Sequence, residues 1–283
     1  MKKGLKSMLL GGVIAASLLT SGCNWFKDDD VGSNPTQEEL YAEFYQVAQT
    51  SMSKPYYTLS MSQQEKNLTS NTTTQGIMNE TIDQKGLYRE TEYEGTKTYA
   101  YAIKQNDQYV VYYKEISGTT TEKSSVYTTQ EAFDKNHVNI IKTLNEHRGY
   151  SLDNVFSSKT IEELTDNLKM NLLEGGDGYA GKLPIEPIIT LEKKMVNQKD
   201  ELTLSGTVSY KTVIDKDVEF KFVITCRDNL IKKIYTSIDY IVVINDVEEH
   251  ILMTQTLDIE YVTNPALVPS EEDLQEFPQP TNN

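Results

Sequence analysis

Two stretches of the sequence decide the fold class: residues 201–211, ELTLSGTVSYK, and residues 249–261, EHILMTQTLDIEY. In the first stretch the large apolar side chains occupy even positions, and in the second all of them except Leu252 occupy odd positions. Alternation over this length indicates β-strands with one buried and one polar face. The sequence therefore predicts a broad antiparallel sheet that is covered on one side only.

Further strands are expected on both sides of these two. Residues 56–127 are rich in Thr and Tyr and are divided by turn-forming pairs, namely Glu94-Gly95, Asn106-Asp107 and Ser117-Gly118. Links this short cannot hold a parallel crossover, so these segments predict an antiparallel meander. With residues 187–196, 218–227 and 230–244, the C-terminal part gives about five long strands joined by hairpins.

Helices are predicted where a Thr is followed three residues later by Glu, which is the pattern of a capping box. The three pairs are Thr36/Glu39, Thr128/Glu131 and Thr160/Glu163, and each precedes a stripe of apolar residues at helical spacing. An apolar stripe must be covered, and the inner face of the sheet is the surface available. The expected class is α+β in one domain, and a division into two domains at about 150–182 is the alternative.

The N-terminus has the pattern of a secretory signal. Lys2, Lys3 and Lys6 are followed by an apolar stretch from Met8 to Leu19 and then by Thr20-Ser21-Gly22-Cys23. Two alternatives are an uncleaved membrane anchor with an incidental cysteine, and ordinary secretion with a free Cys23. In each case the folded part lies outside the cytoplasm.

The composition excludes several classes of function. The net charge of −15 and a pI near 4.7 argue against nucleic acid binding, which needs a basic face. Three His, two Cys and the absence of hydrolase or phosphate-loop motifs predict no catalytic centre, no metal site and no cofactor. Cys226 shares its parity with Phe220, Phe222 and Ile224 and is expected to be a buried apolar residue.

The order of these segments resembles the LolA-like group of bacterial lipoproteins, including the LppX and LprG type. Thr20-Ser21-Gly22-Cys23 resembles a lipobox, with Thr20 where the family prefers Leu. The resemblance implies a signal peptide at 1–22, a palmitate-type lipid anchor on Cys23, a tether at 23–35, a LolA-like domain at 36–270 and a Pro-rich tail at 271–283. It also implies a curved half-barrel with helices on its concave face. The expected location is the outer side of the cell membrane, and the Lys-, Asn- and Tyr-rich composition is typical of Gram-positive bacteria.

Many members of this group hold an acyl chain or another hydrophobic ligand in the concavity. The residues expected to face such a ligand are Phe133, Ile140, Leu144, Leu164, Leu168, Tyr99 and Tyr101. The alternative is a non-enzymatic lipoprotein that binds a protein partner or senses the envelope and has a filled core. A void beneath the helices favours the carrier, and tight packing there favours the interaction protein.

Overall fold

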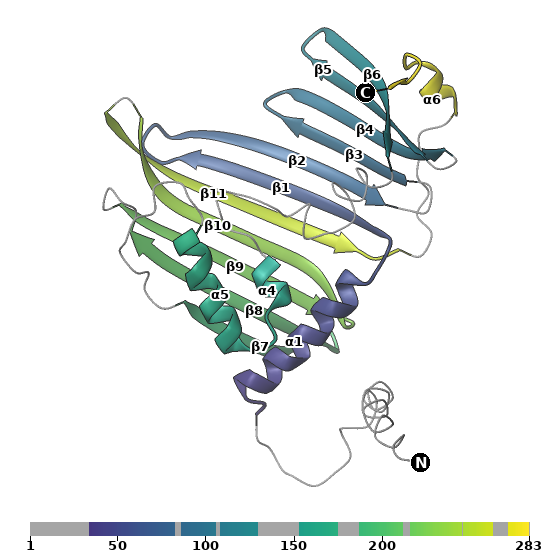
Figure 1. Ribbon diagram of the computed structural model, residues 1–283. Helices are drawn as coiled ribbons and strands as arrows, with labels where there is room; N and C mark the ends of the chain where they lie inside the picture. Colours follow the sequence, from purple (N-terminus) through teal and green to yellow (C-terminus); the bar gives the residue numbers. More distant parts are fainter. Residues whose placement is uncertain are drawn as a thin grey trace, which may run out of the picture. The chain divides into compact units, whose positions relative to one another are not determined.

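The strands form one sheet of twelve, in the order β12-β6-β5-β4-β3-β2-β1-β11-β10-β9-β8-β7 (Figure 1). The computed structural model describes residues 34–82, 86–105, 108–129, 153–174, 187–211, 216–244, 246–262 and 271–282. Every pairing from β1 to β11 is antiparallel, and only β12 pairs in parallel, with β6. The predicted broad antiparallel sheet is thereby confirmed.

The strands lie close to the predicted ranges. The first run comprises β1 Tyr57–Asn67, β2 Thr72–Ile82, β3 Gly86–Tyr93, β4 Thr96–Gln105, β5 Gln108–Ser117 and β6 Thr120–Thr129. The second run comprises β7 Ile188–Val196, β8 Lys199–Lys211, β9 Asp217–Arg227, β10 Leu230–Ile244 and β11 Val247–Glu260, and β12 is Thr281–Asn282. The pairing of β1 with β11 joins the two runs, so residues from both sides of 150–182 share one sheet.

The second run is buried on one face, as its alternation predicts. Leu202, Leu204 and Val208 are buried, while the odd-numbered residues between them are partly exposed. The buried parity continues across the junction, because Leu59 lies opposite Ile259, and both are at most 2% exposed. We call this side of the sheet the helix-bearing face and the other side the opposite face.

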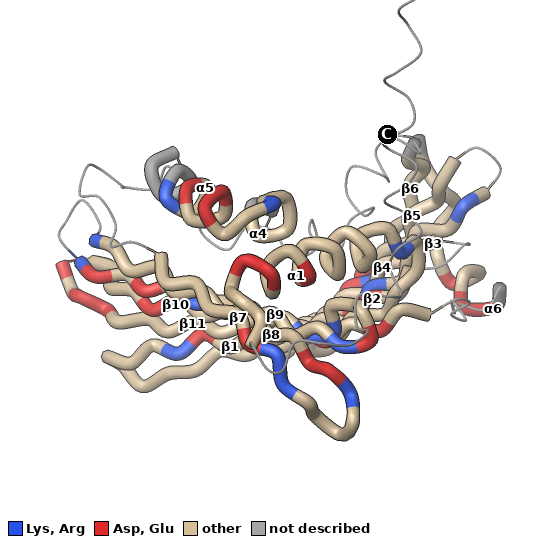
Figure 2. Tube along the Cα trace, turned by 90° about the horizontal axis from the view of Figure 1, so that it is seen from below, with Lys and Arg blue, Asp and Glu red and all other residues tan. Residues whose placement is uncertain are grey.

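Helix α1, Gln37–Met52, packs on the helix-bearing face against β7, β8 and β10 (Figure 2). Figure 2 shows the sheet curving around α1, with α4, Asp153–Ser157, and α5, Ile161–Glu174, on the same side. Helix α6, Glu271–Gln275, lies on the opposite face. The curved sheet therefore follows the expected arrangement.

Two of the three predicted capping pairs lie at helix N-termini. The Thr36 hydroxyl accepts from the Glu39 N–H at 3.3 Å, and Glu39 accepts from the Thr36 N–H at 2.8 Å. The Thr160 hydroxyl likewise accepts from the Glu163 N–H at 3.1 Å. The prediction for Thr128 was wrong: Thr128 lies within β6, opposite Tyr109, because strand pairing continues through this residue.

Both edges of the sheet are occupied. At the β7 edge, the Gln37 side chain donates to the Leu191 carbonyl at 2.8 Å and accepts from the Leu191 N–H at 2.7 Å. At the β6 edge, Thr281–Asn282 pairs with Val126 and Tyr127. The Pro-rich tail therefore returns to the sheet and adds a short strand to it. These contacts pair the backbone of Leu191 at one edge and of two residues of β6 at the other, which shortens the unpaired stretches that favour aggregation.

Replacement of Gly206 would disturb the core of the sheet. Gly206 lies opposite Phe222 in the pairing of β8 with β9, and the fully buried Phe222 ring covers it. A Cβ atom on Gly206 would lie 2.1 Å from the Phe222 Cζ, so only glycine fits beneath this ring.

Candidate functional site

The interface between α1 and the sheet is filled by large side chains. Tyr41 and Phe44 on α1 are 0% exposed and belong to the main core with residues from β7 to β11. The Tyr41 hydroxyl donates to the Ser158 carbonyl at 3.2 Å, which ties α1 to the segment after α4. A cavity of only about 10 Å³ lies between α1, α4 and β10, bordered by Phe156 and Ile234. That volume is at the lower limit for one water molecule.

The structure divides the predicted ligand-facing residues. Leu164 and Leu168 on α5 are at most 4% exposed and belong to the main core on the helix-bearing face. Tyr99 and Tyr101 lie on the opposite face. Ala100 lies opposite Arg89, and Arg89 lies opposite Glu80, so Ala100 shares the helix-bearing face with Glu80. The two tyrosines flank Ala100 in β4 and therefore point the other way. These four residues therefore do not form one site. The other predicted site residues, Cys23, Phe133, Ile140 and Leu144, lie outside the described residues.

A second apolar cluster lies on the helix-bearing face of the first strand run. It consists of Leu87, Ala102 and Tyr109, with Ile82 and Val111 packed against it. The contacts of α1, α4 and α5 are instead with β7, β8, β10 and one another. The three residues of the second cluster are buried, at most 8% exposed, and Ile82 packs against both this cluster and the main core, so the two clusters are neighbours on the same face of the sheet.

A buried ion pair lies between the two apolar regions. Glu80 is 0% exposed, and its carboxylate accepts from the Arg89 Nε at 2.7 Å and from the Tyr57 hydroxyl at 3.2 Å. A buried carboxylate requires this compensation, because an unpaired charge in the interior is costly. The sequence analysis did not identify Glu80 or Arg89. The sequence contained one sign of this site: Glu80 is a charged residue at the same strand parity as Met78 and Ile82, which is the parity that faces the core.

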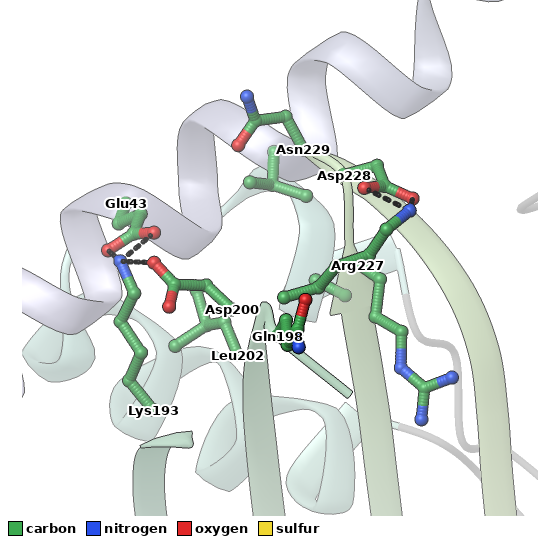
Figure 3. Close-up of a pocket in the computed structure, with 11 residues that line it drawn as sticks. Glu43, Lys193, Gln198, Asp200, Leu202, Arg227, Asp228 and Asn229 are labelled. Atoms are coloured by element: carbon green, nitrogen blue, oxygen red, sulfur yellow. Dashed lines mark hydrogen bonds and ion pairs between the residues drawn. The ribbon is translucent and has the colours of Figure 1, made fainter. Parts of the chain in front are cut away.

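A polar groove of about 460 Å³ opens where α1 passes the turns β7–β8 and β9–β10 (Figure 3). Its lining residues are Glu43, Val47, Lys193, Gln198, Lys199, Asp200, Leu202, Cys226, Arg227, Asp228 and Asn229. Both turns are tight and have positive φ at two successive residues, Asn197 and Gln198 in one and Asp228 and Asn229 in the other. Such turns favour Asn and Asp, which places polar side chains at the mouth of the groove.

The charges of this polar groove pair with one another. The Lys193 ammonium lies 2.8 Å from a Glu43 oxygen and 3.5 Å from an Asp200 oxygen. Partial burial disfavours the charged form of Lys193, but the hydrogen bond to Glu43 and the nearby acids outweigh this effect, so its pKa is raised. At the base, burial and the charge of Glu43 raise the pKa of the Cys226 thiol to about 12. The groove thus combines paired charges with a protonated thiol, and neither supplies a nucleophile.

The described part of the chain contains no group of three or more His, Cys, Asp or Glu side chains that could hold a metal ion. His250 contacts Asp239 on the opposite face, where both side chains are about 40% exposed. Within the same residues, no helix is long and apolar enough to cross a membrane.

No family model matches the chain, and no curated protein matches its sequence. Two solved structures are similar at low level. A DUF1329 family protein from Desulfovibrio piger is 8% identical with a TM-score of 0.26, and the match covers 84% of this chain and 98% of that chain. A putative outer membrane lipoprotein-sorting protein domain from Vibrio parahaemolyticus is 10% identical with a TM-score of 0.23, and the match covers 83% and 96%. Neither likeness is close enough to carry an argument about function.

Proposed function

We propose that the protein is an extracytoplasmic lipoprotein, anchored through Cys23, that binds a hydrophobic molecule of the cell envelope on the helix-bearing face of β2–β5. The lipobox-like sequence before Cys23 and the basic start of the chain support the anchor. The observation that carries the binding proposal is the second apolar cluster, Leu87, Ala102 and Tyr109, which is buried beside the main core and distinct from it.

The apolar composition of the second cluster suits a long-chain ligand. An acyl chain gains about 0.8 kcal/mol for each CH₂ group that it buries, so it needs few polar contacts. Arg89 lies two residues after Leu87 on β3, on the same face, and its side chain is 28% exposed although it pairs with Glu80. Such a ligand would place its chain on the apolar cluster and a polar head group near Arg89. This arrangement accounts for the lack of a catalytic motif.

The second candidate is a lipoprotein that binds a protein partner through a filled scaffold. The observation that favours it is the cavity of only about 10 Å³ between α1 and the sheet. A ligand held beneath α1 would need a far larger volume, since small-molecule pockets measure about 300–1,000 Å³. Within the described residues, the carrier proposal therefore rests on the first strand run.

Binding is tested with a fluorescent fatty acid and the mature chain, with unlabelled fatty acid as competitor. We expect saturable binding that the competitor displaces. Ala100→Trp places a large side chain on the helix-bearing face of β4, beside Arg89, and should weaken the binding about tenfold. Tyr99→Trp is the matched control, because it changes the neighbouring residue on the opposite face. Uncompeted fluorescence, or equal effects of both variants, would favour the interaction protein.

The anchor is tested separately by metabolic labelling with an alkyne-bearing fatty acid. The wild-type chain should incorporate the label, and Cys23→Ala should abolish incorporation and leave an unprocessed precursor. Labelling that survives Cys23→Ala would exclude this cysteine as the anchor and would leave the binding experiment unaffected.

A further inference from the structure

The described C-terminal tail, residues 271–282, occupies the opposite face of β4–β6, away from α1 (Figure 2). Tyr88, Tyr101 and Tyr112 lie side by side across β3, β4 and β5 and form an aromatic ladder there. The Phe277 ring meets this ladder edge-on, with its centroid 6.3 Å from that of Tyr101 and 5.4 Å from that of Tyr112. Edge-to-face packing at these distances is the favoured geometry for aromatic pairs.

Polar contacts fix the direction of the tail on β6. The Lys123 ammonium lies 2.7 Å from the Glu276 carboxylate and 5.8 Å from the centroid of the Phe277 ring. The Ser125 hydroxyl donates to the Pro278 carbonyl. Beyond Pro278, Thr281–Asn282 adds a parallel strand to the β6 edge. Strand addition combined with side-chain pockets is the way in which many domains bind extended peptides.

The tail itself contains little regular structure. Helix α6 has five residues and β12 has two, so few backbone hydrogen bonds hold the segment together. Segments with few such bonds open locally at low cost in free energy. An open tail leaves the aromatic ladder and the β6 edge available to another peptide with the same chemistry.

We propose that the aromatic ladder, Lys123 and the β6 edge form a peptide-docking groove that the tail occupies in cis. Its partner in trans is an extended segment of another protein that carries an acidic residue, an aromatic residue and a proline in succession, as Glu276-Phe277-Pro278 does. The tail acts as an internal competitor, so the apparent affinity for the partner equals the intrinsic affinity multiplied by the fraction of molecules in which the tail is undocked. This groove lies on the face away from the proposed lipid site and is independent of it.

The test uses the full chain and a fluorescent peptide with the sequence of residues 270–283, followed by fluorescence anisotropy. Phe277→Ala in the full chain weakens the internal competitor, and we expect it to bind the peptide about tenfold more tightly than the wild-type chain does. Adding Lys123→Glu to that variant should abolish binding. Adding Tyr113→Ala instead should leave binding unchanged, because this residue of β5 points to the helix-bearing face.

Circular dichroism melting shows whether each variant remains folded, and Glu276→Lys replaces Phe277→Ala if the latter unfolds. A folded variant with a weakened tail that binds no peptide would overturn the proposal. Equal affinity of the wild-type and Phe277→Ala chains would also overturn it, since the peptide would then bind elsewhere. A peptide with alanine in place of its phenylalanine should not bind.

Discussion

Replacing Arg89 with leucine should strongly destabilise the fold, because it leaves a buried carboxylate without its cation. Glu80 is 0% exposed, and Arg89 Nε donates to its carboxylate at 2.7 Å, while the Tyr57 hydroxyl supplies a weaker contact at 3.2 Å. Removing one partner of a buried pair costs about 3–5 kcal/mol. Because the Arg89 side chain is 28% exposed, water already reaches one side of the pair. We therefore expect a loss of about 3 kcal/mol, at the lower end of that range.

The assay is urea unfolding followed by far-ultraviolet circular dichroism. The double variant Glu80→Leu/Arg89→Leu should regain most of the loss, because two leucines bury no unpaired charge. The reasoning is refuted if Arg89→Leu changes the free energy of unfolding by less than about 0.5 kcal/mol, the size expected for an exposed site. It also fails if the double variant loses as much as the two single variants together.

Three further predictions concern the second strand run. Leu204→Asp should lower the free energy of unfolding by about 3 kcal/mol or more, because it buries a charge. Thr203→Asp should change the free energy of unfolding by less than about 0.5 kcal/mol. Equal urea midpoints for these two variants would contradict a one-sided sheet. Gly206→Ala should lower the free energy of unfolding by about 1–3 kcal/mol, because its Cβ would lie 2.1 Å from Phe222. Adding Phe222→Leu to this variant should restore part of the loss, as measured by thermal melting. Since burial raises the pKa of Cys226 to about 12, its thiol is neutral at pH 8, so iodoacetamide should alkylate it in urea but not in the native chain.

The strands of the second run could be predicted from the sequence because burial acts on alternate residues over more than ten positions. Leu202, Leu204 and Val208 leave no doubt about which parity faces the core, and the structure buries all three. The pairing of β1 with β11 could not be read in the same way. It joins segments about 190 residues apart, and periodicity carries no information on strand order.

The orientation of β4 was misjudged for a physical reason. Tyr99 and Tyr101 alternate with smaller residues, which indicated that the tyrosines face inward. The structure instead places Ala100 and Ala102 on the helix-bearing face. Tyrosine has a large apolar ring and a polar tip, so it suits a partly wet surface as well as a core. The register of β4 is fixed by its neighbours, and the sequence of one strand does not contain that information.

The two features that organise the candidate sites both depend on long-range contacts. Arg89 and Tyr57 reach the buried Glu80 carboxylate from the two neighbouring strands. Phe277 is anchored only because the aromatic ladder and Lys123 lie beside it. The sequence indicated a short turn in the tail, but a two-residue strand has no periodicity that could predict its partner.

Native mass spectrometry of the mature lipoprotein, purified from its own membrane, tests the central proposal most directly. The account predicts a species heavier than the acylated chain by the mass of one apolar molecule, which organic solvent releases. Ala100→Trp should reduce the population of that species, and Tyr99→Trp should not. A single mass equal to that of the acylated chain, with no extractable ligand, would contradict the account and favour the protein-interaction candidate.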